Sequence, residues 1–365
     1  MTSRETELRM VLGNTNVCIF LLVNTNVCIY GGTMVTIKDI AKAAGVDPST
    51  VSRTLSGSPL VKEQTRSLIL SLCDQMGYMP NALARGLVKN KTRNLGMLVP
   101  NLANPYYAEL MSLVGNVAKD MGYNVLWCNS FLDEELELKY FKLLIENQVD
   151  GMIVHPINGH RLDNYKRIIQ DVPTVFIGDI PDTEGIASVS TDNQAAAKLA
   201  VQHLYEQGCR SLAFIGANMS KAAHVNRVIG FETASNDFGI DSIVVHNDAF
   251  YSNTMDRGYY YFKEYYERAL SAATGIIAVS DYAAIGVMKA CKEMGLSVPH
   301  DIQVIGFDNL DFSSLPNIEL STVAPNKESL VEKAMTMLST MLQEGIANHR
   351  DIVFPKLIVR NTTKQ

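Results

Sequence analysis

The N-terminal fold is decided by Val35-Thr-Ile-Lys-Asp-Ile-Ala-Lys-Ala-Ala-Gly-Val46 and by the next segment, Asp47-Pro-Ser-Thr-Val-Ser-Arg-Thr-Leu55. In the first segment, the i, i+3, i+4 and i+7 positions of one helical face are occupied by Ile37, Ile40, Ala41 and Ala44. Thr36 can cap this helix, with Asp39 at the capping-box position. Gly45 can adopt the left-handed conformation that ends it. The first segment therefore predicts a short amphipathic helix.

The second segment predicts a second short helix, with Asp47 as its N-cap and Pro48 in its first turn. Val51 and Leu55 lie one turn apart and should pack on the first helix, which leaves the opposite face free. Two short helices joined by a tight glycine turn are typical of the helix-turn-helix, which lays its second helix in a major groove.

A third helix is expected from about Lys62 to Met76, with Leu68, Leu72 and Met76 one turn apart and Gly77 as its terminator. Residues 34–94 hold nine Lys/Arg against four Asp/Glu, a net charge of +5, although the whole chain carries −6. A basic head on an acidic body indicates that the head alone meets a polyanion.

Together with Gly77-Tyr-Met-Pro-Asn-Ala-Leu-Ala-Arg-Gly-Leu87, these segments resemble the head of the LacI/GalR (lactose-repressor) family of bacterial transcription regulators. The resemblance implies that Pro48 and Ser49 are base-reading positions and that Arg53 is the recognition-helix arginine. It also implies a hinge helix over residues 81–88, whose leucine wedges into the minor groove. The expected DNA-binding residues are Thr36, Pro48, Ser49, Thr50, Ser52, Arg53, Asn81, Ala84 and Leu87.

In the rest of the chain, short apolar runs suited to buried parallel strands alternate with helical segments. These runs are residues 95–99, 124–128, 151–154, 174–177, 212–216, 243–245, 275–279 and 302–306. Such β-α-β alternation predicts two doubly wound α/β lobes, which bind ligands at the carboxyl ends of their strands.

The resemblance extends over residues 34–363 through Asn104-Pro-Tyr-Tyr-Ala-Glu109, Val149-Asp-Gly-Met-Ile153, Ser280-Asp-Tyr-Ala-Ala-Ile-Gly286, Gly295-Leu-Ser-Val-Pro299 and Ile305-Gly-Phe-Asp308. It implies a periplasmic-binding-protein-like, two-lobed α/β core with an effector in its cleft. The effector-binding positions that it implies are Tyr106, Tyr107, Asp179, Arg227, Asp281 and Asp308. The chemistry agrees, because arginine and carboxylates can hold vicinal hydroxyls while an aromatic face covers a sugar ring. Plain packing of the tyrosines and an inter-lobe salt bridge of Arg227 are the alternatives.

No catalytic or metal-binding motif competes with this interpretation. The sequence contains no G-x-G-x-x-G, P-loop, G-x-S-x-G or H-E-x-x-H pattern. Its closest histidines, His155 and His160, have no third ligand nearby, and its six cysteines form no C-x-x-C pair. We therefore expect no enzyme, no metal site and no cofactor.

The first 33 residues differ from the rest. Asn14-Thr-Asn-Val-Cys-Ile-Phe20 recurs almost unchanged from Asn24 to Tyr30, which indicates a tandem duplication rather than a fold element. We interpret residues 1–33 as a leader without an assigned role. It is either disordered or the result of a mis-assigned start, in which case Met34 is the true beginning. The expected domains are the leader, a helix-turn-helix domain (34–80), a hinge and linker (81–94) and an effector-binding and dimerisation domain (95–363).

The sequence thus predicts a homodimeric, cytoplasmic repressor that binds palindromic operator DNA and answers to a sugar or sugar phosphate. No apolar run reaches the length of a membrane span; the longest, residues 17–23, has seven residues. One alternative is a catabolite-control-type regulator that responds to a phosphocarrier protein. A second is a solute-binding protein for transport, which would need an export signal and no DNA-binding head.

Overall fold

The computed structural model describes residues 35–78, 91–158, 165, 172–180, 185–246, 254–345 and 349–364. The chain divides into two compact units, Met1–Asn81 and Ala82–Gln365, and each is described by itself. No helix among these described residues is long and apolar enough to cross a membrane.

The N-terminal unit contains three helices, α1 (Ile37–Ala44), α2 (Pro48–Leu55) and α3 (Glu63–Met76). Thr36 and Asp39 form the expected capping box at the start of α1, and Gly45 ends that helix with φ = 67°. The predicted helices and their caps are therefore confirmed.

The core of this unit is a small apolar cluster in which Ile40 of α1, Val51 of α2 and Ile69 of α3 are fully buried. Leu68, which we expected on the buried stripe of α3, is 48% exposed instead. The reason is that α3 itself has apolar residues on several of its faces, at positions 68, 69, 70 and 72. The hydrophobic periodicity therefore does not select one face. The buried stripe runs through Ile69 and Cys73.

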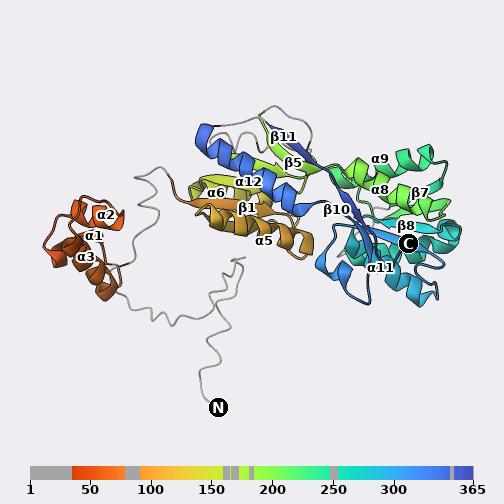
Figure 1. The fold of residues 1–365 in the computed structure, drawn as a ribbon, viewed down its shortest axis with the longest axis horizontal. Coiled ribbons are helices and arrows are strands. Elements are labelled where there is room, and N and C mark those ends of the chain that lie inside the picture. Colours follow the sequence, from red (N-terminus) through yellow and green to blue (C-terminus); the bar gives the residue numbers. More distant parts are fainter. Residues whose placement is uncertain are drawn as a thin grey trace, which may run out of the picture. The chain divides into compact units, whose positions relative to one another are not determined.

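The larger unit contains two six-stranded sheets, one in each lobe (Figure 1). The first sheet has the order β11-β5-β4-β3-β1-β2, and all its pairs are parallel. Its strands are β1 (Asn94–Val99), β2 (Asn124–Asn129), β3 (Gly151–Val154), β4 (Thr174–Ile177), β5 (Ala187–Thr191) and β11 (Arg350–Val353).

The second sheet has the order β12-β10-β9-β8-β6-β7, and only β12 is antiparallel to its neighbour. Its strands are β6 (Ser211–Ile215), β7 (Asp241–Val245), β8 (Gly275–Ala278), β9 (Gln303–Phe307), β10 (Ser321–Ala324) and β12 (Lys356–Ile358). The two doubly wound lobes that the sequence predicts are therefore present.

Helices cover both faces of the first sheet. In this lobe, α5 (Pro105–Asp120) and α12 (Lys327–Glu344) pack on the face that carries Met97, while α6 (Glu134–Glu146) packs on the opposite face against Leu98. Successive side chains of a strand point to opposite faces, so neighbouring residues of β1 enter different cores.

In the second lobe, α8 packs against α9 and α10 packs against α11. These helices are α8 (Asn193–Glu206), α9 (Ala222–Asp237), α10 (Thr254–Tyr265), which continues into a π-helical turn (Tyr266–Leu270), and α11 (Asp281–Glu293). A short 3-10 helix, Asp311–Ser314, follows β9.

The chain crosses between the lobes three times, from β5 to α8, from β10 to α12 and from β11 to β12 (Figure 1). Thr191 at the end of β5 donates a hydrogen bond to the carbonyl of Pro325, which follows β10, at 3.2 Å. Two of the crossings are therefore tied together at the base of the cleft.

Candidate functional site

The exposed face of α2 carries the residues that we expect to contact DNA. Pro48, Ser49, Ser52 and Arg53 are exposed, Thr50 is half-buried, and Thr36 is exposed at the start of α1. Asn81, Ala84 and Leu87 lie outside the described residues.

Buried contacts hold α2 in this orientation. Val51 packs in the core of the head, and the Thr54 hydroxyl donates to the carbonyl of Thr50 at 2.9 Å. From α3, the Arg66 guanidinium donates to the carbonyl of Ser58 at 2.6 Å. The Asp47 side chain accepts the backbone N–H of Ser49 at 2.8 Å. Hydrogen bonding from the Ser49 side chain, and then from its backbone, lowers the pKa of the Asp47 carboxyl. One polar face of α2 is thus presented to solvent by a fixed scaffold.

The second site is a cavity of about 280 Å³ in the larger unit, lined by both lobes near the carboxyl ends of their strands. Five of the six expected effector-binding residues line it: Tyr106, Tyr107, Asp179, Arg227 and Asp308. This is the position where parallel α/β sheets bind ligands.

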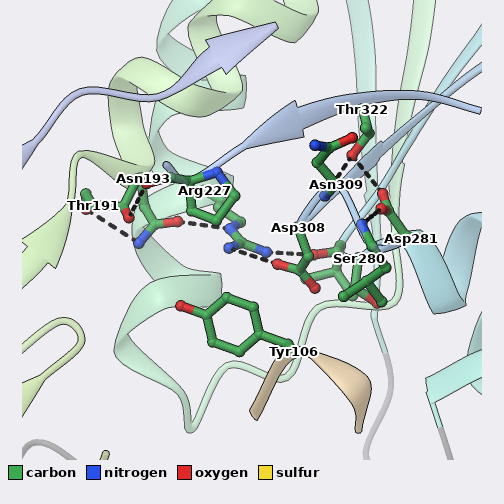
Figure 2. A network of polar contacts seen from close by, with 12 residues as sticks. Tyr106, Thr191, Asn193, Arg227, Ser280, Asp281, Asp308, Asn309 and Thr322 are labelled. Atoms are coloured by element: carbon green, nitrogen blue, oxygen red, sulfur yellow. Dashed lines mark hydrogen bonds and ion pairs between the residues drawn. The ribbon is translucent and has the colours of Figure 1, made fainter. Parts of the chain in front are cut away.

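Arg227 is the polar centre of this cavity (Figure 2). Its Nε donates to Asn193 Oδ1 at 2.7 Å and its Nη1 to the Val279 carbonyl at 2.6 Å, while Nη2 lies 3.6 Å from Asp308 Oδ1. Its guanidinium also lies 4.5 Å from the ring centroid of Phe307. Val279 directly follows β8, Phe307 ends β9 and Asp308 directly follows β9. Arg227 therefore forms its ion pair within the second lobe.

Asp308 directly follows β9 and has an unusual backbone. Its φ is 105° and that of Asn309 is 45°, conformations that cost non-glycine residues on the order of 1–3 kcal/mol each. Burial raises the pKa of the Asp308 carboxyl to about 6, while the Arg227 charge opposes that shift. Such strain at a buried charged group is typical of ligand-binding positions.

Asp179 follows β4 in the first lobe and connects it to the second. Its Oδ2 accepts the side-chain amides of Asn193 at 3.0 Å and of Asn226 at 2.8 Å. The carboxylate therefore contacts two residues of the second lobe. One of them, Asn193, also accepts a hydrogen bond from Arg227 and so connects Asp179 to Arg227.

The aromatic wall of the cavity comes from the start of α5, where Asn104 caps the helix and Pro105 occupies its first turn. The rings of Tyr106 and Tyr107 meet edge to face at 5.4 Å, and the His155 ring lies 4.9 Å from Tyr107. Burial raises the pKa of both phenols. Figure 2 shows the Tyr106 ring below the Arg227–Asp308 pair, and all three residues line the cavity.

Asp281, which we expected to contact the effector, lies beneath the cavity wall instead. It is fully buried and is not among the lining residues. Its Oδ2 accepts the N–H of Leu310 at 2.8 Å and the hydroxyl of Ser313 at 2.7 Å, and its Oδ1 accepts the hydroxyl of Thr322 at 2.5 Å. The absence of a side chain at Gly306 leaves room for this carboxylate. Asp281 is therefore occupied in fixing the segment after Asp308.

Several lining residues were not predicted from the sequence. Among them are Asn193, which connects Asp179 to Arg227, and three residues at the starts of α9 and α10, namely Lys221, His224 and Arg257. None of them belongs to a motif, and only the tertiary arrangement of α8, α9 and α10 brings them together. Among the described residues, no group of three or more acidic, histidine or cysteine side chains is arranged to hold a metal ion.

Comparisons with known proteins identify the families of the head and of the core. Residues 36–81 match the profile of the bacterial regulatory proteins of the lacI family, and residues 201–363 match that of the periplasmic binding protein-like domain. The chain is 32% identical to catabolite control protein A of Priestia megaterium, over 90% of this chain and 99% of that protein. It is also 32% identical to the ribose operon repressor of Halalkalibacterium halodurans, over 91% and 98%.

Solved structures show the same architecture. A periplasmic binding protein/LacI transcriptional regulator from Alkaliphilus metalliredigens QYMF, complexed with D-xylulofuranose, is 30% identical with a TM-score of 0.65, covering 75% of this chain and all of that one. A lac repressor dimer bound to operator has a TM-score of 0.80 at 23% identity, over 91% and 99% of the two chains, and shows the fold.

The fold and the two sites define a transcription regulator with a helix-turn-helix head and a periplasmic-binding-type core. The chain belongs to the LacI family of bacterial regulatory proteins. The fold class and the family that the sequence predicts are confirmed.

Proposed function

We propose that this chain is a repressor that binds a palindromic operator as a homodimer and that a small carbohydrate in the cavity between its lobes controls that binding. The proposal assigns residues 34–80 to DNA reading, 81–94 to the hinge and 95–363 to effector binding and dimerisation. It assigns no role to residues 1–33.

The observation that carries the proposal is the Arg227–Asp308 pair beside the Tyr106 ring. The 3.6 Å separation of Nη2 and Oδ1 exceeds the 2.7–2.9 Å or so of a short charged hydrogen bond. A pair of vicinal hydroxyls can accept from the guanidinium and donate to the carboxylate, while the tyrosine covers the C–H face of the sugar.

The relatives support this ligand class. One is named a ribose operon repressor, and the Alkaliphilus protein was solved with D-xylulofuranose. A cavity of about 280 Å³ is at the small end of ligand sites and suits a monosaccharide.

Polar contacts between the lobes provide a route by which a ligand would influence the rest of the core. Asp179 of the first lobe contacts Asn193 and Asn226 of the second. At another point, Lys327 at the start of α12 donates to the Glu109 carboxylate of α5 and to the carbonyl of Asn309 at 3.1 Å. Because Asn309 follows Asp308, a ligand held by Asp308 would act on both lobes and shift their equilibrium.

The test begins with operator sites selected by the protein from fragmented genomic DNA. Operator binding is then followed by fluorescence anisotropy while pentoses, hexoses and their phosphates are added. We expect at least one of them to change operator affinity by about tenfold, a coupling of about 1.4 kcal/mol. If no sugar does so and a phosphocarrier protein does, the effector proposal is wrong and the catabolite-control alternative is correct.

A further inference from the structure

One end of the cavity, at the starts of α9 and α10, carries positive charge that no acidic residue in the described part of the chain balances. Lys221, Arg227 and Arg257 all line the cavity, and among the described residues Arg227 alone of the three has a carboxylate partner. Neither the Lys221 ammonium nor the Arg257 guanidinium makes a hydrogen bond or ion pair with a residue that the structure describes. Both residues are half-buried, and a cation that is partly removed from water normally has such a partner.

The backbone adds to this positive end. Lys221 is the N-cap of the 16-residue helix α9, and its side chain makes no capping hydrogen bond. The next two residues, Ala222 and Ala223, also line the cavity. The first N–H groups of a helix have no partner within the helix and carry a partial positive charge, so this end of α9 attracts an anion.

The electrostatics show that these groups act on one another. The pKa of Lys221 is lowered first by burial and then by the charge of Arg257. The pKa of His224 is well below its ordinary value because of burial and then because of Lys221, Arg227 and Arg257. Burial is also the main cause that lowers the pKa of His155 to about 4. His155 and His224 are therefore neutral at pH 7 and do not add to the positive charge. Lys221 and Arg257 lie close enough to repel each other.

The acidic residues of the cavity are engaged elsewhere. Asp308 pairs with Arg227, and Asp179 accepts the amides of Asn193 and Asn226. Two positive charges, those of Lys221 and Arg257, remain for a ligand. A phosphate monoester carries close to two negative charges at pH 7, whereas a carboxylate carries one.

We propose that the effector is a phosphorylated sugar whose phosphate binds between Lys221 and Arg257 at the start of α9, while Arg227 and Asp308 hold the sugar hydroxyls. This inference rests on the proposed function and specifies its ligand. In this arrangement Lys221 and Arg257 select a ligand with a negatively charged group, and the Arg227–Asp308 pair selects one with neighbouring hydroxyl groups.

The experiment is calorimetric titration of the full chain with matched ligands that differ only in the anionic group. The probes are D-ribose with D-ribose 5-phosphate, D-xylulose with D-xylulose 5-phosphate, D-glucose with D-glucose 6-phosphate, and D-glucuronate as the carboxylate. We expect at least one phosphate to bind about tenfold or more tightly than its parent sugar and than glucuronate, because each charged hydrogen bond contributes at least about that factor.

The variants Lys221→Gln and Arg257→Gln test the assignment of the phosphate subsite. Each should reduce the preference for the phosphate over its parent sugar by about tenfold, and Lys221→Arg and Arg257→Lys should restore part of it. The matched control is Lys292→Gln, which removes a charge of the same lobe from an exposed position away from the cavity and should keep the wild-type preference.

The outcomes separate this inference from the proposed function. If a neutral sugar or glucuronate binds as tightly as every phosphate, the phosphate subsite is wrong although the effector role stands. If both glutamine variants keep the full phosphate preference, the assignment to Lys221 and Arg257 is wrong. If no carbohydrate binds, the effector role and the phosphate subsite are both overturned.

Discussion

Replacing Asp281 by asparagine should change how the stability of the larger unit depends on pH. Burial, and then the charge of Asp308, raise the pKa of the Asp281 carboxyl from 3.8 to about 7. The folded state therefore binds a proton that the unfolded state has released over this interval. The stability contributed by the protonated carboxyl is present below pH 3.8 and is lost as the pH rises towards 7.

The size of the effect follows from that interval. One pKa unit corresponds to about 1.36 kcal/mol, so the interval amounts to at most about 4 kcal/mol at pH 8. Asparagine has nearly the same shape and cannot ionise. Its carbonyl can accept from Leu310 and Ser313, and its amide can donate to the Thr322 hydroxyl. Relative to wild type, Asp281→Asn should therefore gain stability between pH 5 and pH 8.

The assay is urea denaturation at both pH values, followed by the fluorescence of Trp127, the single tryptophan of the chain, which lies in β2 of this unit. Asp241→Asn, at an exposed position of β7, is the matched control and should retain the wild-type pH dependence. Only the part of that interval above pH 5, about two pKa units, is lost between the two measurements, so we expect the difference between Asp281→Asn and wild type to shift by about 2–3 kcal/mol in favour of the variant at pH 8. Equal pH dependence in both proteins would show that the Asp281 carboxyl does not lose its proton over this interval.

Three further predictions concern DNA binding. Arg53→Ala, on the exposed face of α2, should cost about 1–3 kcal/mol and relax selectivity at one base pair per half-site, measured by anisotropy on operator variants; equal loss on random DNA would make Arg53 a phosphate contact. A chain that begins at Met34 should bind operator within about threefold of the full chain, because residues 1–33 precede the three helices and carry no net charge; a large loss would give that segment a binding role. Leu87→Ala should weaken operator binding far more than binding to random DNA, as gel-shift titrations would show, and unchanged operator affinity would argue against the minor-groove wedge.

Local signals predicted those elements of the structure whose cause is local. The caps at Thr36 and Asp47 and the left-handed turn at Gly45 depend on neighbouring residues, and the apolar β1, β3 and β4 strands stand out as continuous runs. The strand β5, Ala187-Ser-Val-Ser-Thr191, was not predicted, although it is fully buried, because its small hydroxyl side chains do not form an apolar run.

The strands β10, β11 and β12 were also not predicted. They are three or four residues long and lie at the crossings between the lobes, where their pairing partners are far away in the sequence. The pairing of β11 with β5, for example, joins residues about 160 positions apart. No local pattern records such a pairing.

The cavity was only partly predictable for the same reason. Arg227 and Asp308 were found through the family resemblance, and the structure places them together. Asp281 lies in a family motif that equally suggested contact with the effector. Its burial beneath Gly306, however, depends on the packing of α11 against β9. Lys221 and Arg257 belong to no motif, and their common position depends on how α9 and α10 are arranged around the second sheet.

The core of the proposed function is that a ligand between the lobes controls operator binding through Arg227 and Asp308. It is tested most directly by measuring operator affinity against effector concentration for wild type, Arg227→Ala and Asp308→Asn, with Lys292→Gln as the control. We predict that wild type and the control respond at the same effector concentration. Each cavity variant should require at least about tenfold more effector, corresponding to a loss of about 1.5 kcal/mol or more. An unchanged response of both cavity variants would contradict the claim.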